Sequence, residues 1–188
     1  MATKKSPTRG RIAFTNGGTG RMICAIRPWE RFIESNPENR VVTNSTLDII
    51  WGNRLLQSKT YHADTKGIFE NVIKDREWIE SEPYCDWEYY NQKLSIGQAF
   101  DKHWNGTYSE DPEDYRPKLY LGNDDIAYGK AIIDAAEGEH GNEKTVIVQP
   151  WGRGASNEEA VGSVIDQTSR SFDYDFYLEL VKELRSEY

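Results

Sequence analysis

The sequence predicts an α/β fold, a Rossmann-like parallel sheet with flanking helices, and two observations support this expectation. Short apolar runs alternate with longer segments in which apolar residues recur every three or four positions, in the order strand, helix, strand, helix. The first of these units, RIAFTNGGTGRMICAI at residues 11–26, joins strand to helix through a glycine-rich turn. The 188 residues provide for one domain with a proper core, and not for two full ones.

The first strand is expected from Ile12 to Thr15, where an apolar run meets the turn Asn16-Gly17-Gly18. A helix with one apolar face is expected from Gly20 onward, on the spacing of Met22, Ile23, Ile26, Trp29 and Ile33. Pro28 lies within that helix and has no amide hydrogen for the preceding turn. The helix therefore either kinks at Pro28 or begins its regular part near Arg27.

A second strand is expected at residues 38–42, after the turn Asn36-Pro37, and a helical stretch from Asp48 to Leu56 follows it. Right-handed crossovers between such strands produce a parallel sheet. After a loop at residues 107–117, a further strand is expected at residues 118–121.

The next helix is expected to run through Ile126, Ile133 and Ala136 and to stop near Gly138. Asn123 is a suitable N-cap for it, and two aspartates follow in the first turn, where negative charge is favourable.

Aromatic residues are frequent between positions 81 and 106. Within this segment Ile96, Ala99, Phe100 and His103 share one helical face, which predicts a helix. Two interpretations apply to the aromatic residues Trp87, Tyr89, Tyr90 and Trp104. We favour packing beneath a domain surface over stacking on a ligand.

The last part of the chain repeats the opening pattern. Residues 144–156, KTVIVQPWGRGAS, predict an apolar strand that enters a glycine-containing loop, and this loop extends through Gly162. A final amphipathic helix is expected at residues 173–188, with Phe176, Tyr177, Leu180, Val181 and Leu184 on its apolar side. That stripe has no sheet of its own to cover, so we expect it to stay exposed and to favour self-association.

Composition excludes several classes of protein. The net charge of −8 disfavours nucleic-acid binding, because basic residues cluster only in the N-terminal tail. Cys24 and Cys85 are isolated, and the three histidines are scattered, so we expect no disulfide, no metal and no cofactor. Apolar runs are too short to span a membrane and no secretory signal is visible, so we expect a cytoplasmic protein.

The glycine turn fits neither standard phosphate-binding motif. The third glycine of G-x-G-x-x-G would fall on Ile23, and no Gly-Lys-Ser/Thr follows. Its position is more informative, because ligands of parallel sheets bind at the carboxyl ends of strands, close to backbone amides and helix N-termini. The equally weighted alternative is a tight turn without a ligand.

Three segments together resemble glycosyltransferase family 9, the lipopolysaccharide heptosyltransferase type. They are the strand and turn with NGGTGRMI, then PENRVVTN, and finally KTVIVQPWGRGAS followed by DQTSRSF. The chain is most similar to versions associated with tailed bacteriophages. The resemblance implies two facing Rossmann-like domains, one binding a saccharide acceptor and the other a nucleotide-sugar donor. It divides the chain into a basic tail (1–10), an acceptor domain (11–142) and an incomplete donor domain (143–188).

The resemblance also implies functional residues. The acceptor would lie against Gly17, Gly18, Gly20 and Arg21. The donor diphosphate would lie against Gly152, Arg153, Gly154, Ser169 and Arg170. Members of the family commonly carry Gly-Asp at the end of the first turn, where this chain has Gly20-Arg21. A guanidinium cannot take a proton from the acceptor, so Asp101 is the first candidate for the base and His103 the second.

Two functions follow as hypotheses. The first is a glycosyltransferase in its complete form, inactive in this chain alone because the donor groove is missing. The second is a non-catalytic module that binds a saccharide or a protein. A nucleotide-dependent oxidoreductase is excluded by the glycine spacing and by Thr43-Asn44, which stand where a ribose-binding acid would follow the second strand.

Overall fold

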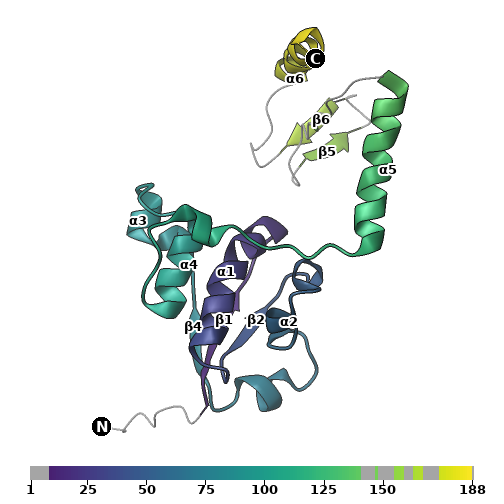
Figure 1. Ribbon diagram of the computed structural model, residues 1–188. Helices are drawn as coiled ribbons and strands as arrows, with labels where there is room; N and C mark the ends of the chain where they lie inside the picture. The colour runs from purple at the N-terminus through teal and green to yellow at the C-terminus, as the bar shows by residue number, and fades with distance from the viewer. Residues whose placement is uncertain (1–8, 141–146, 148–154, 159–162, 167–173, 188) are drawn as a thin grey trace. The chain divides into compact units, whose positions relative to one another are not determined.

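The computed structural model describes residues 9–140, 147, 155–158, 163–166 and 174–187 (Figure 1). The chain divides into two compact units, Met1–Gly122 and Asn123–Tyr188, and each is described by itself.

Unit 1 contains a four-stranded sheet in which every neighbouring pair is parallel. Its strands are β1 (Arg11–Thr15), β2 (Arg40–Thr43), β3 (Thr60–His62) and β4 (Glu77–Glu80). Their order across the sheet is β3-β2-β1-β4. Helices flank this sheet, so the predicted α/β, Rossmann-like class is confirmed.

The α-helices of unit 1 are α1 (Thr19–Ser35), α2 (Arg54–Gln57), α3 (Trp87–Tyr90) and α4 (Ile96–Asn105). Short 3-10 segments are η1 (Asp48–Ile50), η3 (Pro83–Cys85) and η4 (Pro112–Tyr115), and η2 (Phe69–Ile73) is a π-helical turn. The first strand, the first helix, the second strand and the helix at residue 96 are confirmed, with small shifts of their ends.

The sheet is covered on both faces because successive strand residues point to opposite sides. On one face, Ala13 and Val41 pack with α1, α2 and α4, and the cluster includes Met22, Ala25, Ile26, Trp29, Phe32, Leu56, Phe100 and Trp104 (Figure 1). On the other face, Ile12 and Val42 pack against Val72 of η2. Helix α4 meets α1 through stacked rings, with 6.3 Å between the centroids of Trp104 and Trp29, and within α4 the ring of Phe100 lies 4.6 Å from that of Trp104.

Helix α1 continues through Pro28, which is buried within it. The alternative that the regular helix begins only near Arg27 is therefore wrong. The carbonyl of Pro28 accepts a hydrogen bond from the side chain of Asn105 at 3.2 Å, which ties the middle of α1 to the end of α4.

Three expectations for unit 1 are corrected. Residues 118–121 form no strand in the described chain, and Leu119, Tyr120 and Leu121 are exposed. The two edge strands are β4, which lies beside β1, and β3, which lies beside β2, and neither strand was predicted from the sequence. The expected helix from Asp48 to Leu56 is split into η1 and α2 at Gly52, whose φ of +86° favours glycine and breaks helical geometry.

In unit 2, α5 (Asn123–His140) extends past Gly138, which does not end it. The expected strand in residues 144–150 lies outside the described residues, apart from Ile147. Downstream, β5 (Ala155–Glu158) and β6 (Ser163–Asp166) pair antiparallel. The loop expected through Gly162 is therefore wrong for residues 155–158, and β6 was not predicted. The final helix is confirmed as α6 (Tyr174–Glu187), in which Phe176, Leu178 and Val181 are exposed.

Candidate functional site

The chain leaves β1 through a short turn, residues 16–20, which we call the elbow. Residues 17–20 are exposed, and Gly17 has a φ of +107° that favours glycine. Gly18 is the N-cap of α1, with no side-chain cap and no acidic residue in the first turn of this described helix. The elbow thus presents the unpaired amides and positive dipole of a 17-residue helix to solvent.

The strand order places this elbow at a topological switch point. From β1 the chain moves outward through β2 to β3, and then returns to lay β4 on the opposite side of β1. The loops that leave β1 and β4 therefore diverge at the carboxyl edge of the sheet. In open parallel sheets, the crevice between two such loops is where ligands bind.

Arg21 connects the two sides of this crevice. Its guanidinium forms an ion pair with Glu82, at 3.2 Å to Oε2, and donates to the carbonyl of Ser81 at 3.1 Å. The rings of Tyr84 and Phe100 lie 5.0 and 5.6 Å from the guanidinium carbon. With its side chain only 10% exposed, Arg21 is held by the protein itself, and the anion that it pairs with here is Glu82.

Polar atoms at the same place remain unpaired. Nε of Arg21, Oγ of Ser81 and Oε1 of Glu82 are buried atoms without a hydrogen-bond partner among the described residues. Ser81 is only 3% exposed. Because buried polar atoms are nearly always satisfied, three such atoms beside an uncapped helix N-terminus mark this crevice as the candidate site.

The elbow glycines contribute in different ways. A Cβ at Gly17 would lie 3.1 Å from Cδ of Arg21, so the absence of a side chain there lets Arg21 cross toward Glu82. A Cβ at Gly18 or Gly20 would meet no described atom within 4 Å. No side chain therefore covers the Cα atoms of Gly18 and Gly20, and both residues are exposed.

Asp101 does not lie at the elbow. It is 1% exposed and pairs with Arg31, and it also accepts hydrogen bonds from Tyr115 and Asn105, each at 2.6 Å. At roughly 1.5 Å of rise per residue, the helix from Arg21 to Arg31 covers about 15 Å. Asp101 thus belongs to a buried network far along α1 from the crevice.

This network also determines the properties of Tyr115. Burial, followed by the hydrogen bond to Asp101, raises the pKa of Tyr115 to about 12. A cavity of about 320 Å³ lies beside the network and is lined by Arg11, Arg31, Ser35, Asp101, Asn105 and Thr107. Since Arg11 begins β1 and Ser35 ends α1, this cavity lies at the amino edge of the sheet, opposite the elbow.

His103 is occupied by a different carboxylate. Its Nε2 lies 3.1 Å from Oδ2 of Asp86, and Nζ of Lys102 lies 3.0 Å from the same oxygen. Burial alone would raise the pKa of Asp86, but hydrogen bonds outweigh it and lower the pKa to about 2. The donors are Lys102, the amide of Tyr89, His103 and the amide of Glu88. These bonds make Asp86 the N-cap of α3 and the anchor of α3 on α4.

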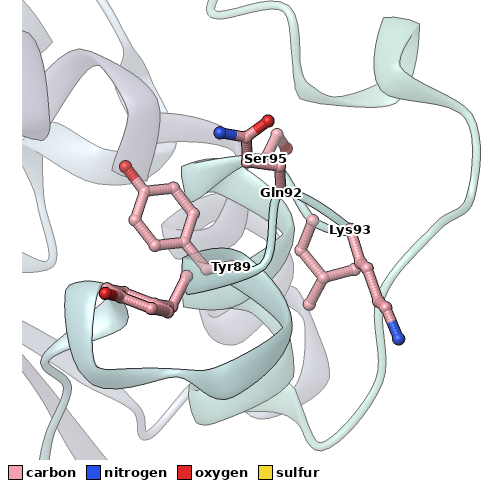
Figure 2. A pocket seen from close by; sticks show the side chains of 6 residues that line it. Tyr89, Gln92, Lys93 and Ser95 are labelled. Atoms are coloured by element: carbon pink, nitrogen blue, oxygen red, sulfur yellow. The ribbon is translucent and has the colours of Figure 1, made fainter.

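The aromatic residues in and before α4 differ in burial. Trp104 is buried, as the packing interpretation predicts. Trp87 and Tyr90 are instead 72% and 73% exposed, so packing does not account for them. Close to them is a pocket of about 530 Å³ lined by Tyr89, Tyr90, Gln92, Lys93, Leu94 and Ser95 (Figure 2).

Sequence analysis missed Ser81, Glu82 and this pocket. No local motif identifies them, because their significance depends on β4 lying beside β1. The predicted donor residues Gly152, Arg153, Gly154, Ser169 and Arg170 lie outside the described residues. Within the described ranges, no cluster of three His, Cys, Asp or Glu side chains could hold a metal ion.

Comparison with protein-family models, with curated proteins and with solved structures found no match to this chain. Among the helices that the structure describes, none combines the length and apolar character needed to cross a membrane.

Proposed function

We propose that unit 1 is the acceptor-binding half of a glycosyltransferase that, in its complete form, transfers a sugar from a nucleotide-sugar to a saccharide acceptor. The observation that carries this proposal is the open glycine elbow at the β1/β4 switch point of an all-parallel sheet. The resemblance to glycosyltransferase family 9 supplies the reaction. A cytoplasmic site of action and a bacteriophage origin belong to the same proposal.

The crevice offers complementary groups to a saccharide. The exposed first turn of α1 presents amides that donate to a hydroxyl or phosphate oxygen. Oε1 of Glu82 is buried and unpaired, so it becomes an acceptor for a ligand hydroxyl only if the Glu82 side chain, which is 44% exposed, turns toward the ligand. In this arrangement Glu82, and not Asp101, is the carboxylate placed to contact the acceptor hydroxyl that reacts.

One observation favours the second function, a non-catalytic saccharide-binding module. Asp101 and His103 are committed to structural contacts, and Arg21 stands where relatives of the resembled family carry an acid. The two functions differ in their donor. If the chain is part of a transferase, adding a nucleotide-sugar to the nitrogen-15-labelled chain should shift the backbone amide signals of Gly152 and Gly154. If it is a binding module, these signals should not change.

The acceptor site is tested by titrating the labelled full chain with uncharged disaccharides and with sugar phosphates. We expect the amide signals of Thr19 and Gly20 to shift with at least one of them. Gly18→Asp places a capping carboxylate over these amides, and should weaken binding about tenfold or more while it stabilises α1. Gly129→Ala on α5, where a Cβ also meets no described atom, is the matched control.

Two results would contradict the proposed function. One is the absence of elbow shifts with every saccharide tested. The other is a set of elbow shifts that persists unchanged in Gly18→Asp.

A further inference from the structure

We propose that the pocket beside α3 is a second saccharide subsite, which binds one ring of an uncharged part of the acceptor. The inference deepens the proposed function and rests on it, because it names the class of acceptor. It is carried by the exposed rings and by a lining in which Lys93 is the one charged residue.

The pocket has a suitable size and lining. Its volume of about 530 Å³ lies within the roughly 300–1,000 Å³ of typical small-molecule sites. Tyr89 and Tyr90 supply aromatic surface, Gln92 supplies an amide, and Leu94 closes the floor as a buried apolar residue. Flat apolar faces bordered by hydrogen-bonding groups match a sugar ring, which has C–H faces and a rim of hydroxyls.

The exposed rings are costly unless something covers them. Trp87 and Tyr90 stack on each other at 6.4 Å, with 23° between their planes, yet most of each side chain faces solvent. Aromatic rings carry a negative face, on which the weakly positive C–H groups of a pyranose pack favourably. Such exposed aromatic surface is typical of a binding region.

The loop that forms the pocket holds an unusual backbone. Gln92 has a φ of 59°, a conformation that L-residues with long side chains rarely adopt. Gly would fit this position with less strain, but would lack the amide. Gln92 lines the pocket together with Tyr89 and Ser95 (Figure 2).

The pocket has little charge in its lining, and the charges of the neighbouring helix α3 are paired. Asp86 and Glu88 are both bonded to Lys102, and Asp86 also contacts His103. Lys93 is the one ionisable side chain other than tyrosine in the lining, and Figure 2 shows its amine pointing away from Tyr89. A single lysine whose amine points away from Tyr89 is a weak site for a phosphate or carboxylate, and this favours an uncharged ring.

A continuous row of aromatic side chains joins the pocket to the elbow. The ring of Tyr84 lies 5.0 Å from the guanidinium carbon of Arg21 and 5.6 Å from the ring of Tyr89. Tyr89 in turn lines the pocket. An acceptor seated at the elbow with one sugar would reach the pocket with another.

The test uses the labelled full chain with methyl glycosides and disaccharides of glucose, galactose and mannose, and with glucose 1-phosphate. We expect at least one uncharged sugar to shift the backbone amide signals of Gln92 and Lys93. Tyr90→Ala should weaken that binding about tenfold. Tyr128→Ala, at a tyrosine of matching exposure (71%) on α5, should leave it unchanged.

A second variant separates binding from folding. Gln92→Gly keeps the left-handed backbone and removes the side-chain amide group. It should therefore weaken sugar binding without lowering the midpoint of urea unfolding. If Gln92→Gly and the natural chain bind the sugar with equal affinity, the role of the Gln92 side-chain amide is overturned, and the subsite with it.

The remaining outcomes separate this inference from the proposed function. If sugars shift the backbone amide signals of Thr19 and Gly20 but not that of Gln92, the subsite is overturned and the proposed function stands. If they shift the signal of Gln92 but not those of Thr19 and Gly20, the acceptor site proposed at the elbow is overturned. Stronger binding of glucose 1-phosphate at the pocket would overturn an uncharged ligand. Self-association that Tyr90→Ala abolishes, with no sugar bound, would identify the occupant as protein and overturn the proposal.

Discussion

Arg21 and Glu82 are separated by 61 positions in the sequence and form an ion pair of 3.2 Å across the carboxyl edge of the sheet. The pair joins the first turn of α1 to the segment that leaves β4. It neutralises the cation at the elbow, and it leaves one oxygen of Glu82 unpartnered within the described chain.

Glu82→Gln should change ligand preference more than stability. The pair is partly exposed at Glu82, so we expect a loss of about 1 kcal/mol or less in the free energy of unfolding. The same substitution releases the positive charge of Arg21, so phosphorylated saccharides should gain affinity relative to uncharged ones. Urea unfolding measures the first effect and the elbow amide shifts measure the second.

The control for that substitution is Glu113→Gln, which breaks the exposed pair between Glu113 and Arg116. It should alter neither stability nor saccharide preference appreciably. An unchanged ratio of affinities in Glu82→Gln would contradict the electrostatic role of the Arg21–Glu82 pair.

Asp101→Asn should destabilise unit 1 without reaching the elbow. Removing the charge leaves the guanidinium of Arg31 facing a neutral amide, although Arg31 keeps its ion pair with Asp114 at 3.3 Å, so we expect a loss of about 2–3 kcal/mol in the free energy of unfolding. Tyr115→Phe deletes only the hydroxyl that donates to Asp101, so a smaller loss of about 1–2 kcal/mol is expected. Urea unfolding compares the two, and a loss below that of Tyr115→Phe would argue against this network.

Acid should weaken the attachment of α3 through Asp86. The pKa of this carboxyl is about 2 in the folded chain and 3.8 as its ordinary value, so its bonds stabilise the fold fully above pH 4. That stabilisation, about 2 kcal/mol at most, should disappear as the pH falls from 4 through 2. Unfolding free energies of the natural chain and Asp86→Asn should therefore converge at low pH, and parallel curves would contradict this assignment.

Gly52→Ala tests the break between η1 and α2. The new Cβ would lie 2.7 Å from Cβ of Tyr120, and the alanine would have to adopt a φ of +86°. We expect a loss of about 1–3 kcal/mol in unfolding free energy. Gly18→Ala, at a negative φ with open space around it, is the matched comparison and should cost little.

The sequence predicted those parts of the fold that local patterns encode. The apolar run at Ile12 and the helical spacing after Gly20 identify β1 and α1, because each side chain's burial follows from the period of its own element. β3 and β4 are short and carry mixed residues such as His62 and Glu77, so their pairing in the sheet has no comparable local signal. Tertiary neighbours, not propensity, make these segments strands.

For the same reason, only the part of the candidate site that is contiguous in sequence could be predicted. Gly17, Gly18 and Gly20 are visible as a turn between strand and helix. The partner of Arg21 is not, since Glu82 approaches only after the chain has returned to the first strand. Likewise Asp101 resembles an available carboxylate in sequence, and its contact with Arg31 depends on the packing of α4 against α1.

The position of β4 has a consequence for biosynthesis. A ribosome-bound chain that has emerged only through residue 62 holds every residue of β1, β2 and β3, and already possesses the glycine elbow. It lacks the opposite wall, because Ser81 and Glu82 follow the last strand to be added. The two sides of the candidate site should therefore be brought together only late in translation, when the final edge strand docks against the first.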